Sequence, residues 1–285
     1  MSARLPLLIL LAIPVAAHSD VCRPAAETVV QGNVIRLICS QPVTSARMNG
    51  RTVPLFKQSD GEWLALMPVA ATDAPGEASI AFLSSDQQQV SASEVTIHDA
   101  HFATQNVNLA PGIANLHNSP EEIATLKAFR ESLSDVRFWT ERFEAPVPGC
   151  MISPFGVKRY RNHKPTGDYH GGLDLRAPAG EPIRAADDGI VRLAQPLTVL
   201  GNTVGLDHGQ GVETMYLHMS KIAVQPGAQV KRGEVIGYAG STGRANGPHL
   251  HWTLLVNQVQ VNPAQWVTVS PCASTPSGKH HKKSP

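Results

Sequence analysis

Residues 247–254 read Gly-Pro-His-Leu-His-Trp-Thr-Leu, a pattern that predicts a strand with two different faces. Successive side chains of a strand point to opposite sides, so residues two apart share a face. His249 and His251 therefore lie on one face, together with Thr253. The opposite, apolar face consists of Leu250, Trp252 and Leu254. Two imidazoles in front of an apolar back indicate a chemical site built on a rigid sheet.

Two other phrases place histidines in a similar way. Tyr216 and His218 are two apart, and we expect them to share one face of a strand. His170 and Asp174 are four apart, an even spacing that keeps both on one side of an extended chain. Two glycines lie between them and leave room for a close approach. The chain thus offers several imidazoles and a carboxylate from strands of one region.

Imidazole and carboxylate groups together are ligands that suit Zn²⁺. Three protein ligands plus a water would make a catalytic zinc site rather than a closed structural one. Each phrase alone is typical of ordinary polar or core residues. Their joint occurrence in one region favours a metal site.

The composition of the 285 residues predicts a mostly β protein with two domains. Hydrophobic residues make up 42% and charged residues 16%, which excludes a disordered chain. Gly (23) and Pro (22) are plentiful, and this favours short strands and tight turns. The net charge of +1 excludes a general basic surface for nucleic acid or for an anionic membrane.

Residues 18–105 are expected to form an immunoglobulin-like β-sandwich. Short alternating segments are separated there by the turn dipeptides Asn49-Gly50 and Asp60-Gly61 and by Pro75-Gly76. Several short strands at this spacing are typical of a two-sheet fold.

Residues 106–148 are expected to form a linker that contains one short helix. Ser119 is a suitable N-cap, Pro120 suits the first helical position, and Glu122 completes a capping box. An apolar stripe for packing follows at helical spacing, with Ile123, Leu126, Phe129 and Leu133. Residues 149–272 then change to Gly-rich strands, which predict a second β domain.

Residues 1–17 have the features of a removable secretory signal. An apolar run over residues 5–15 ends in two alanines, and it is too short to cross about 30 Å of hydrocarbon. We therefore expect export and no membrane anchor after removal of the signal. Residues 273–285 form a basic tail that is expected to be solvated.

Four cysteines in an exported chain are expected to form two disulfides, for which three connectivities exist. Cys22 and Cys39 lie in the N-terminal region, whereas Cys150 and Cys272 flank the histidine-bearing segment. Pairing within each set would link each domain to itself. We predict the bonds Cys22–Cys39 and Cys150–Cys272.

An ordered set of motifs runs through residues 149–266. It consists of His170-Gly171-Gly172-Leu173-Asp174, Gly201-Asn202-Thr203-Val204, Asp207-His208-Gly209, Tyr216-Leu217-His218-Met219-Ser220, Gly240-Ser241-Thr242-Gly243 and Gly247-Pro248-His249-Leu250-His251-Trp252. This set resembles the lysostaphin-like, or LytM-type, zinc endopeptidases of bacterial cell walls. The resemblance covers less than half of the chain. It implies an antiparallel β-sheet domain, located in the periplasm or secreted, that cleaves peptidoglycan stem peptides or cross-bridges.

The same resemblance implies roles for five residues. His170, Asp174 and His251 would bind zinc, and His218 and His249 would be catalytic without binding it. Strand periodicity alone does not distinguish His249 from His251. The chain contains no His-Glu-x-x-His motif, so a histidine outside the metal shell would act as the base. We expect His249 to be that base and His218 to stabilise the tetrahedral intermediate or protonate the leaving amine.

Three alternatives from other functional classes remain to be compared. A catalytically inactive relative that regulates other wall hydrolases is the main one, but all five positions are filled. A biotinyl or lipoyl carrier is suggested by residues 225–237 and would need a lysine at a hairpin tip. A serine hydrolase using Ser241 lacks the Gly-x-Ser-x-Gly elbow.

Five further residues have weaker signals. We expect His208 to be a turn residue, His163 to be an exposed loop residue near the groove, and Tyr169 to serve packing. Asn115 and Asn118 lie in a stretch from which some family members close the zinc site, so latency is left open. The oligomeric state and the bond that is cleaved are left open too.

Overall fold

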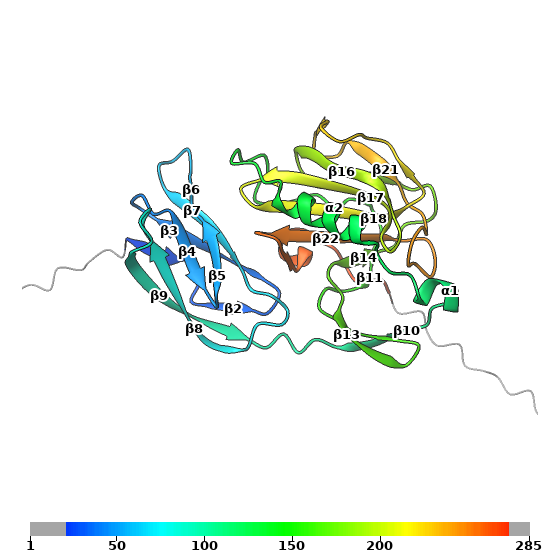
Figure 1. The fold of residues 1–285 in the computed structure, drawn as a ribbon, viewed down its shortest axis with the longest axis horizontal. Helices are drawn as coiled ribbons and strands as arrows, with labels where there is room; N and C mark the ends of the chain where they lie inside the picture. Colours follow the sequence, from blue (N-terminus) through cyan, green and yellow to red (C-terminus); the bar gives the residue numbers. More distant parts are fainter. Residues whose placement is uncertain (1–20, 274–285) are drawn as a thin grey trace, which may run out of the picture.

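The computed structural model describes residues 21–273, which form two β-rich regions (Figure 1). Strands β1 to β9 make up the N-terminal region. One sheet has the order β1 (Cys22–Pro24), β3 (Val34–Cys39), β7 (Trp63–Pro68), β6 (Phe56–Lys57). The other has the order β2 (Thr28–Val30), β9 (Gln89–His98), β8 (Gly76–Leu83), β4 (Ser45–Met48), β5 (Arg51–Pro54). The predicted secretory signal and the basic tail lie outside the described residues.

Local sequence explains why these strands form. In β8, Ala78, Ile80 and Phe82 are buried while alternate residues face outward, which is the period of a strand with one buried face. Asn49 and Gly50 both have positive φ angles, 48° and 73°, as a two-residue hairpin turn between β4 and β5 requires. The two sheets share one apolar core. This arrangement is a β-sandwich, and its immunoglobulin-like topology stays a prediction.

The C-terminal region is built on an antiparallel sheet. Its order is β11 (Met151–Ser153), β14 (Leu173–Leu175), β22 (Leu250–Val256), β18 (Val212–Met219), β17 (Gly201–Gly209), β16 (Gly189–Leu197), β20 (Gln229–Val230), with β23 (Val259–Val261) also paired to β22. A smaller sheet contains β15 (Pro182–Arg184), β21 (Val235–Tyr238) and β19 (Lys221–Ile222). A short 3₁₀ turn, η1 (Pro263–Gln265), follows β23. The prediction of a mostly β fold is confirmed.

The segment between the two regions contributes to the C-terminal one. Strand β10 (Thr104–Val107) pairs in parallel with β12 (Lys158–Arg161), which forms a hairpin with β13 (Lys164–Tyr169). The short helix α1 (Pro111–Ala114) follows, and then α2 (Pro120–Glu131) crosses one face of the large sheet (Figure 1). The sequence did not lead us to expect strand β10.

Helix α2 begins with the predicted capping box. Ser119 Oγ accepts a hydrogen bond from the Glu122 amide, and Glu122 accepts one from the Ser119 amide. Leu126 and Phe129 pack on the large sheet. The expected apolar stripe is wrong at its two ends, because Ile123 and Leu133 are exposed. In the first turn it is Glu122 that contacts the sheet, by accepting hydrogen bonds from Thr198, and Leu133 lies beyond the end of the helix at Glu131.

Both predicted disulfides are present, Cys22–Cys39 and Cys150–Cys272. The first joins β1 to β3. The second joins the start of β11 to the end of the described chain, across a sequence separation of 122 residues. Each bond therefore lies within one region, as expected. Among residues 21–273, no helix is long and apolar enough to cross a membrane.

The two regions are packed against each other through a continuous apolar core. Val34 and Leu66 of the sandwich belong to the same buried cluster as Trp139 and Trp266. The side chain of Gln265 accepts a hydrogen bond from the Val34 amide and donates one to its carbonyl. Gln58 contacts Gln210 in the β17–β18 turn, and Asn257 in the β22–β23 turn donates a hydrogen bond to the Leu66 carbonyl. The N-terminal region is thereby attached at one end of the large sheet.

Candidate active site

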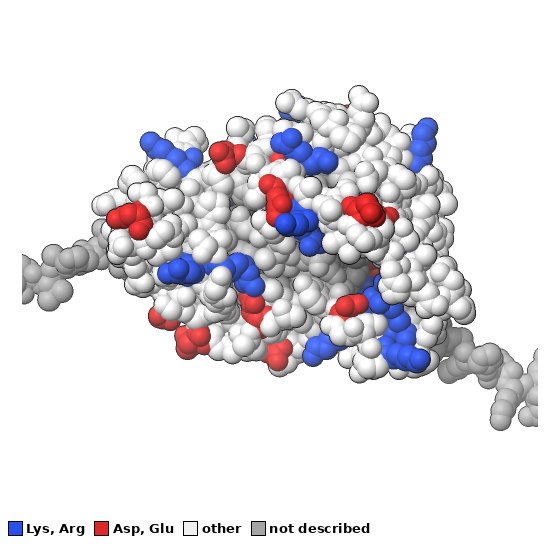
Figure 2. Space-filling view, in the orientation of Figure 1, with Lys and Arg blue, Asp and Glu red and all other residues white. Residues whose placement is uncertain are grey.

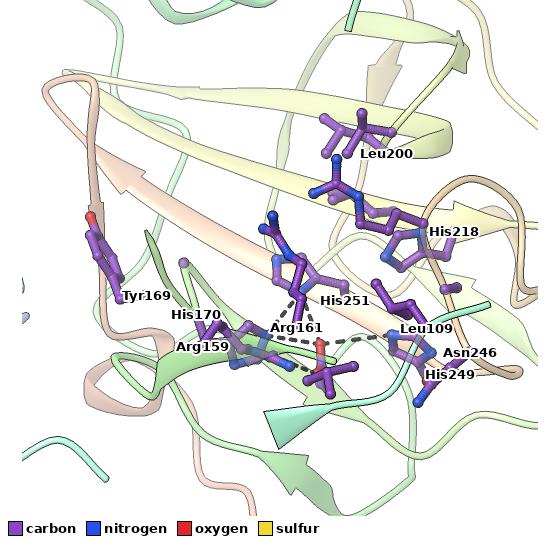
Figure 3. A pocket seen from close by; sticks show the side chains of 17 residues that line it. Leu109, Arg159, Arg161, Tyr169, His170, Leu200, His218, Asn246, His249 and His251 are labelled. Carbon is purple, nitrogen blue, oxygen red and sulfur yellow. Dashed lines mark hydrogen bonds and ion pairs between the residues drawn. The ribbon is translucent and has the colours of Figure 1, made fainter. Parts of the chain in front are cut away.

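All five residues that the sequence singled out line one open groove of about 280 Å³. Its floor lies across three neighbouring inner strands of the large sheet, β14, β22 and β18. One wall comes from β12 and from the segment after β10, and the opposite wall comes from the loop over residues 244–246. Figure 3 shows the rings of His170, His249 and His251 turned towards a common carboxylate, that of Asp174.

Three of these residues form a compact cluster of ligand atoms. Asp174 Oδ1 lies 2.9 Å from His170 Nε2 and 2.9 Å from His251 Nδ1, and the two nitrogens are 3.0 Å apart. Register explains the contact, because Asp174 on β14 pairs directly with His251 on β22. His170 joins them from the turn before β14.

The chemistry of this cluster fits a divalent metal ion. His170 donates its Nδ1 proton to the carbonyl of Pro154 at 2.7 Å, so its Nε2 presents a lone pair to the cluster. His251 is held from behind by Thr253, whose Oγ1 lies 3.0 Å from Nε2. Two imidazole nitrogens and a carboxylate oxygen thus converge on one point, which is the donor set of three-ligand zinc sites.

Charge at the cluster is controlled by Arg159 as well as by the histidines. Its Nη2 lies 3.2 Å from Asp174 Oδ2, so one carboxylate oxygen is held by the guanidinium while the other faces the imidazoles. Burial of Asp174 raises its pKa, but contacts with His170 and His251 lower the pKa more, to well below its ordinary value. These contacts favour the carboxylate form of Asp174.

The other two histidines stand beside the cluster with their free nitrogens towards the groove. His218 donates its Nδ1 proton to the carbonyl of Thr242, and His249 donates its own to the carbonyl of Gly247, each at 2.8 Å. Their ring centres are 5.1 Å apart. His249 Nε2 is 3.8 Å from Asp174 Oδ1. Burial, followed by repulsion from the neighbouring histidines, lowers the pKa of His218 to about 3.

Known proteins are similar to this chain in sequence and in fold. A model of peptidase family M23 matches residues 168–263, a range that includes all five residues. A solved structure from Pseudomonas aeruginosa, provisionally assigned to peptidase M23, is 30% identical with a TM-score of 0.66. The match covers 83% of this chain and 94% of that chain. The chain belongs to peptidase family M23. The lysostaphin-like resemblance read from the motifs is thus confirmed at the level of the family.

Curated proteins are similar to this chain over a shorter range. The DD-carboxypeptidase/endopeptidase Mpg of Neisseria meningitidis is 43% identical over 123 residues, which are 42% of this chain and 28% of that protein. The peptidoglycan DD-endopeptidase ShyC of Vibrio cholerae is 44% identical over 135 residues, which are 44% of this chain and 31% of that protein. The chain therefore matches about a third of the length of these relatives.

One expectation about the M23 sheet is wrong. Tyr216 and His218 do not share a face, because Tyr216 is fully buried in the core, where its hydroxyl accepts a hydrogen bond from the Ala186 amide. Leu217 and His218 both line the groove although they are consecutive. His218 has a left-handed φ of 62°, which turns its side chain to the side that carries His251.

The close approach expected at the two glycines after His170 is present. A Cβ on Gly172 would lie 2.3 Å from the carbonyl oxygen of Trp252, and one on Gly171 would lie 2.4 Å from the side chain of Gln260. The close approach is therefore that of neighbouring protein segments. Gly172 allows β14 to meet β22 in the register that joins Asp174 to His251.

The weaker candidates are arranged as follows. His208 is not a turn residue: it is fully buried within β17, where its ring nitrogens contact the Asp188 carbonyl and the Thr214 hydroxyl. Tyr169 packs on Phe155, as expected, at the edge of the groove. His163 is exposed at the β12–β13 turn and does not line the groove. Asn115 and Asn118 do not line it either.

The sequence analysis missed three arginines of the groove: Arg159, Arg161 and Arg244. Arg159 and Arg161 are two apart in the basic stretch of β12, a spacing that predicts one shared face and could have marked them. Arg244 has no such signal, because it lies in an irregular loop whose position depends on tertiary contacts. Val107 and Leu109, from the segment after the sandwich, also line the groove.

Proposed function

We propose that this protein is a zinc-dependent endopeptidase that hydrolyses peptide cross-links of bacterial peptidoglycan in the periplasm or outside the cell. One observation carries the proposal: three converging ligand atoms lie beside two imidazoles that are held by backbone carbonyls. A structural metal site would need no such second pair of histidines. The names of the curated relatives support a peptidoglycan substrate.

His170, Asp174 and His251 would hold the metal. Zinc in that place supplies a Lewis acid for the scissile carbonyl and lowers the pKa of a water. His249 acts as the general base, because its Nε2 is free and faces the groove while its Nδ1 proton is fixed on Gly247. Asp174 Oδ1 lies 3.8 Å from that Nε2, so the proposed base stands directly beside the ligand cluster.

His218 completes the proposed mechanism from the opposite side. Thr242 fixes its ring so that Nε2 points into the groove. To stabilise the tetrahedral intermediate or to pass a proton to the leaving amine from there, His218 has to become the imidazolium, a form that the negative charge developing in the groove favours. Among wall peptides, the cross-link between D-alanine and diaminopimelate is our preferred substrate. The predicted signal and the two disulfides support an exported protein.

Metal analysis and digestion of purified peptidoglycan together test the proposal. We expect one zinc ion per chain, and mass spectrometry of the digest should show fragments cut at a peptide bond. A zinc-loaded chain that leaves the wall peptides intact would favour the alternative, an inactive regulator of other hydrolases. A chain that binds no zinc would overturn the metal site itself.

A further inference from the structure

Three guanidinium groups line the groove, and they differ in what they contact. Arg159 forms an ion pair with Asp174 at 3.2 Å, and Arg161 forms one with Asp168 at 2.7 Å. Arg244 donates a hydrogen bond from Nη2 to the carbonyl of Leu116, but among the described residues it has no carboxylate partner. Its Nε is buried and has no hydrogen-bond acceptor there. Arg244 is therefore the cation of the groove whose charge is not neutralised.

The loop that carries Arg244 is the loop that holds both non-ligand histidines. The carbonyl of Thr242 fixes His218, the carbonyl of Gly247 fixes His249, and Arg244 lies between them in sequence. The Arg244 amide donates to the carbonyl of Val199 at 2.8 Å, which ties the loop to the start of β17. The guanidinium is thus attached to a backbone that is fixed relative to the reacting groups.

Charges around Arg244 favour an anion. Asp174 is the single carboxylate among the described residues that line the groove, and it is already engaged by Arg159 and the imidazoles. Burial, followed by repulsion from Arg161, lowers the pKa of Arg244, whereas Asp168 raises it. An anion placed between Arg244 and Arg161 would offset both the burial of the Arg244 charge and its repulsion from Arg161. On the face drawn in Figure 2, by contrast, acidic and basic groups are interspersed.

We propose that Arg244, assisted by Arg161, binds a free carboxylate of the substrate peptide on the side of the groove that carries His218. A guanidinium suits this task because its planar array of donors matches the two oxygens of a carboxylate. The inference rests on the proposed function, since the diaminopimelate of a cross-link carries a free carboxylate next to the bond to be cut. The groove would therefore discriminate acidic peptides from amidated ones.

Two synthetic cross-linked stem peptides test this inference, one with the free carboxylate of diaminopimelate and one with a carboxamide in its place. For the zinc-loaded full chain we expect kcat/KM to be about 10- to 100-fold higher for the acid, the usual range for a hydrogen bond to a charged group. Arg244→Gln should remove most of that preference, mainly through KM, and Arg244→Lys should restore part of it.

Arg142→Gln is the matched control, because Arg142 is an exposed arginine outside the groove. This substitution removes the same net charge as Arg244→Gln. It should keep the preference for the acid. Equal kcat/KM for acid and amide in the wild type, or an unchanged preference in Arg244→Gln, would overturn the inference.

A binding experiment separates this inference from the proposed function. Fluorescence anisotropy with labelled acid and amide peptides on His249→Ala reports the charge preference without turnover. If neither peptide is cleaved by the wild type but the acid binds more tightly through Arg244, the endopeptidase proposal fails and the carboxylate site stands. If both peptides are cleaved and bind equally well, the endopeptidase proposal stands and the carboxylate site fails.

Discussion

The β14–β22 pair and the end of β18 both supply histidines to the groove, but they do so in different ways. Asp174 and His251 face each other across a regular antiparallel ladder, so strand geometry alone sets their distance. His218 leaves the regular geometry of β18 through a left-handed φ, and the 240–247 loop fixes its ring. We infer that the metal side depends on the sheet, whereas the histidine side depends on a loop.

The largest effect is expected from substitutions that remove a ligand of the proposed metal site. Asp174→Ala and His251→Ala should each reduce zinc content from one per chain to a small fraction, because each removes one of three ligand atoms. Activity should fall on the order of 10⁴-fold or more, since Lewis-acid stabilisation of several kcal/mol is lost. Elemental analysis beside a cleavage assay measures both. His98→Ala, at an exposed position of the sandwich, is the control, and full zinc occupancy in both ligand variants would refute the assignment.

A smaller effect is expected on the histidine side, and it should leave the metal in place. His218→Ala and His249→Ala should each bind one zinc and fold normally, while the rate falls roughly 10²–10⁴-fold, the usual contribution of a positioned acid or base. The double variant should lose less than the product of the two single losses, because both residues act in one transition state.

Two results would change this picture of the histidines. Near-normal rates in both single variants would remove them from the mechanism. Loss of zinc in His249→Ala would mean that His249, and not His251, is the ligand. His249 and His251 are two residues apart and both line the groove, so an exchange of their roles is the easiest error to make in this assignment.

Arg159 sharpens the comparison, since it acts on the metal side without being a ligand. Arg159→Gln should free Asp174 Oδ2 and weaken zinc binding about 10- to 100-fold, the usual effect of losing such a supporting contact. Competition with a metal chelator gives the affinity directly. Arg161→Gln is the matched control two residues along β12, and an equal loss of affinity there would show that only the general charge of the groove matters.

Strand alternation predicted the shared location of His249 and His251, and motif content predicted the family. Strand alternation failed at Tyr216 and His218, because a single residue with a left-handed φ reverses the direction of every later side chain in the strand. The groove wall formed by Val107 and Leu109 could not be predicted either. That segment belongs to the connection after the sandwich, and only the pairing of β10 with β12 brings it to the site.

The prediction with the smallest effect on the groove concerns the other end of β18, where Glu213 is fully buried. Neither of its carboxyl oxygens has a hydrogen-bond partner among the described residues. Burial, followed by repulsion from Asp207, raises the pKa of Glu213 to about 8. The folded protein therefore keeps a proton on Glu213 that the unfolded chain loses above its ordinary pKa of 4.5.

Stability is consequently expected to fall as the pH rises from 4.5 to 8, with a slope from this group of at most about 1.4 kcal/mol per pH unit. The stabilising effect of the protonated carboxyl is fully present below the unfolded pKa and is lost as the pH passes the folded one. Glu213→Gln should remove this dependence. The free energy of unfolding of the variant, relative to that of the wild type, should therefore rise steadily from pH 5 to pH 8. Urea unfolding of the metal-free protein at several pH values measures it, because zinc binding adds a pH dependence of its own. Glu94→Gln, in an exposed position of β9, should follow the wild type throughout. A constant difference between Glu213→Gln and the wild type would show that Glu213 is already ionised in the folded protein, and that β18 tolerates a buried charge at one end as it tolerates an irregular backbone at the other.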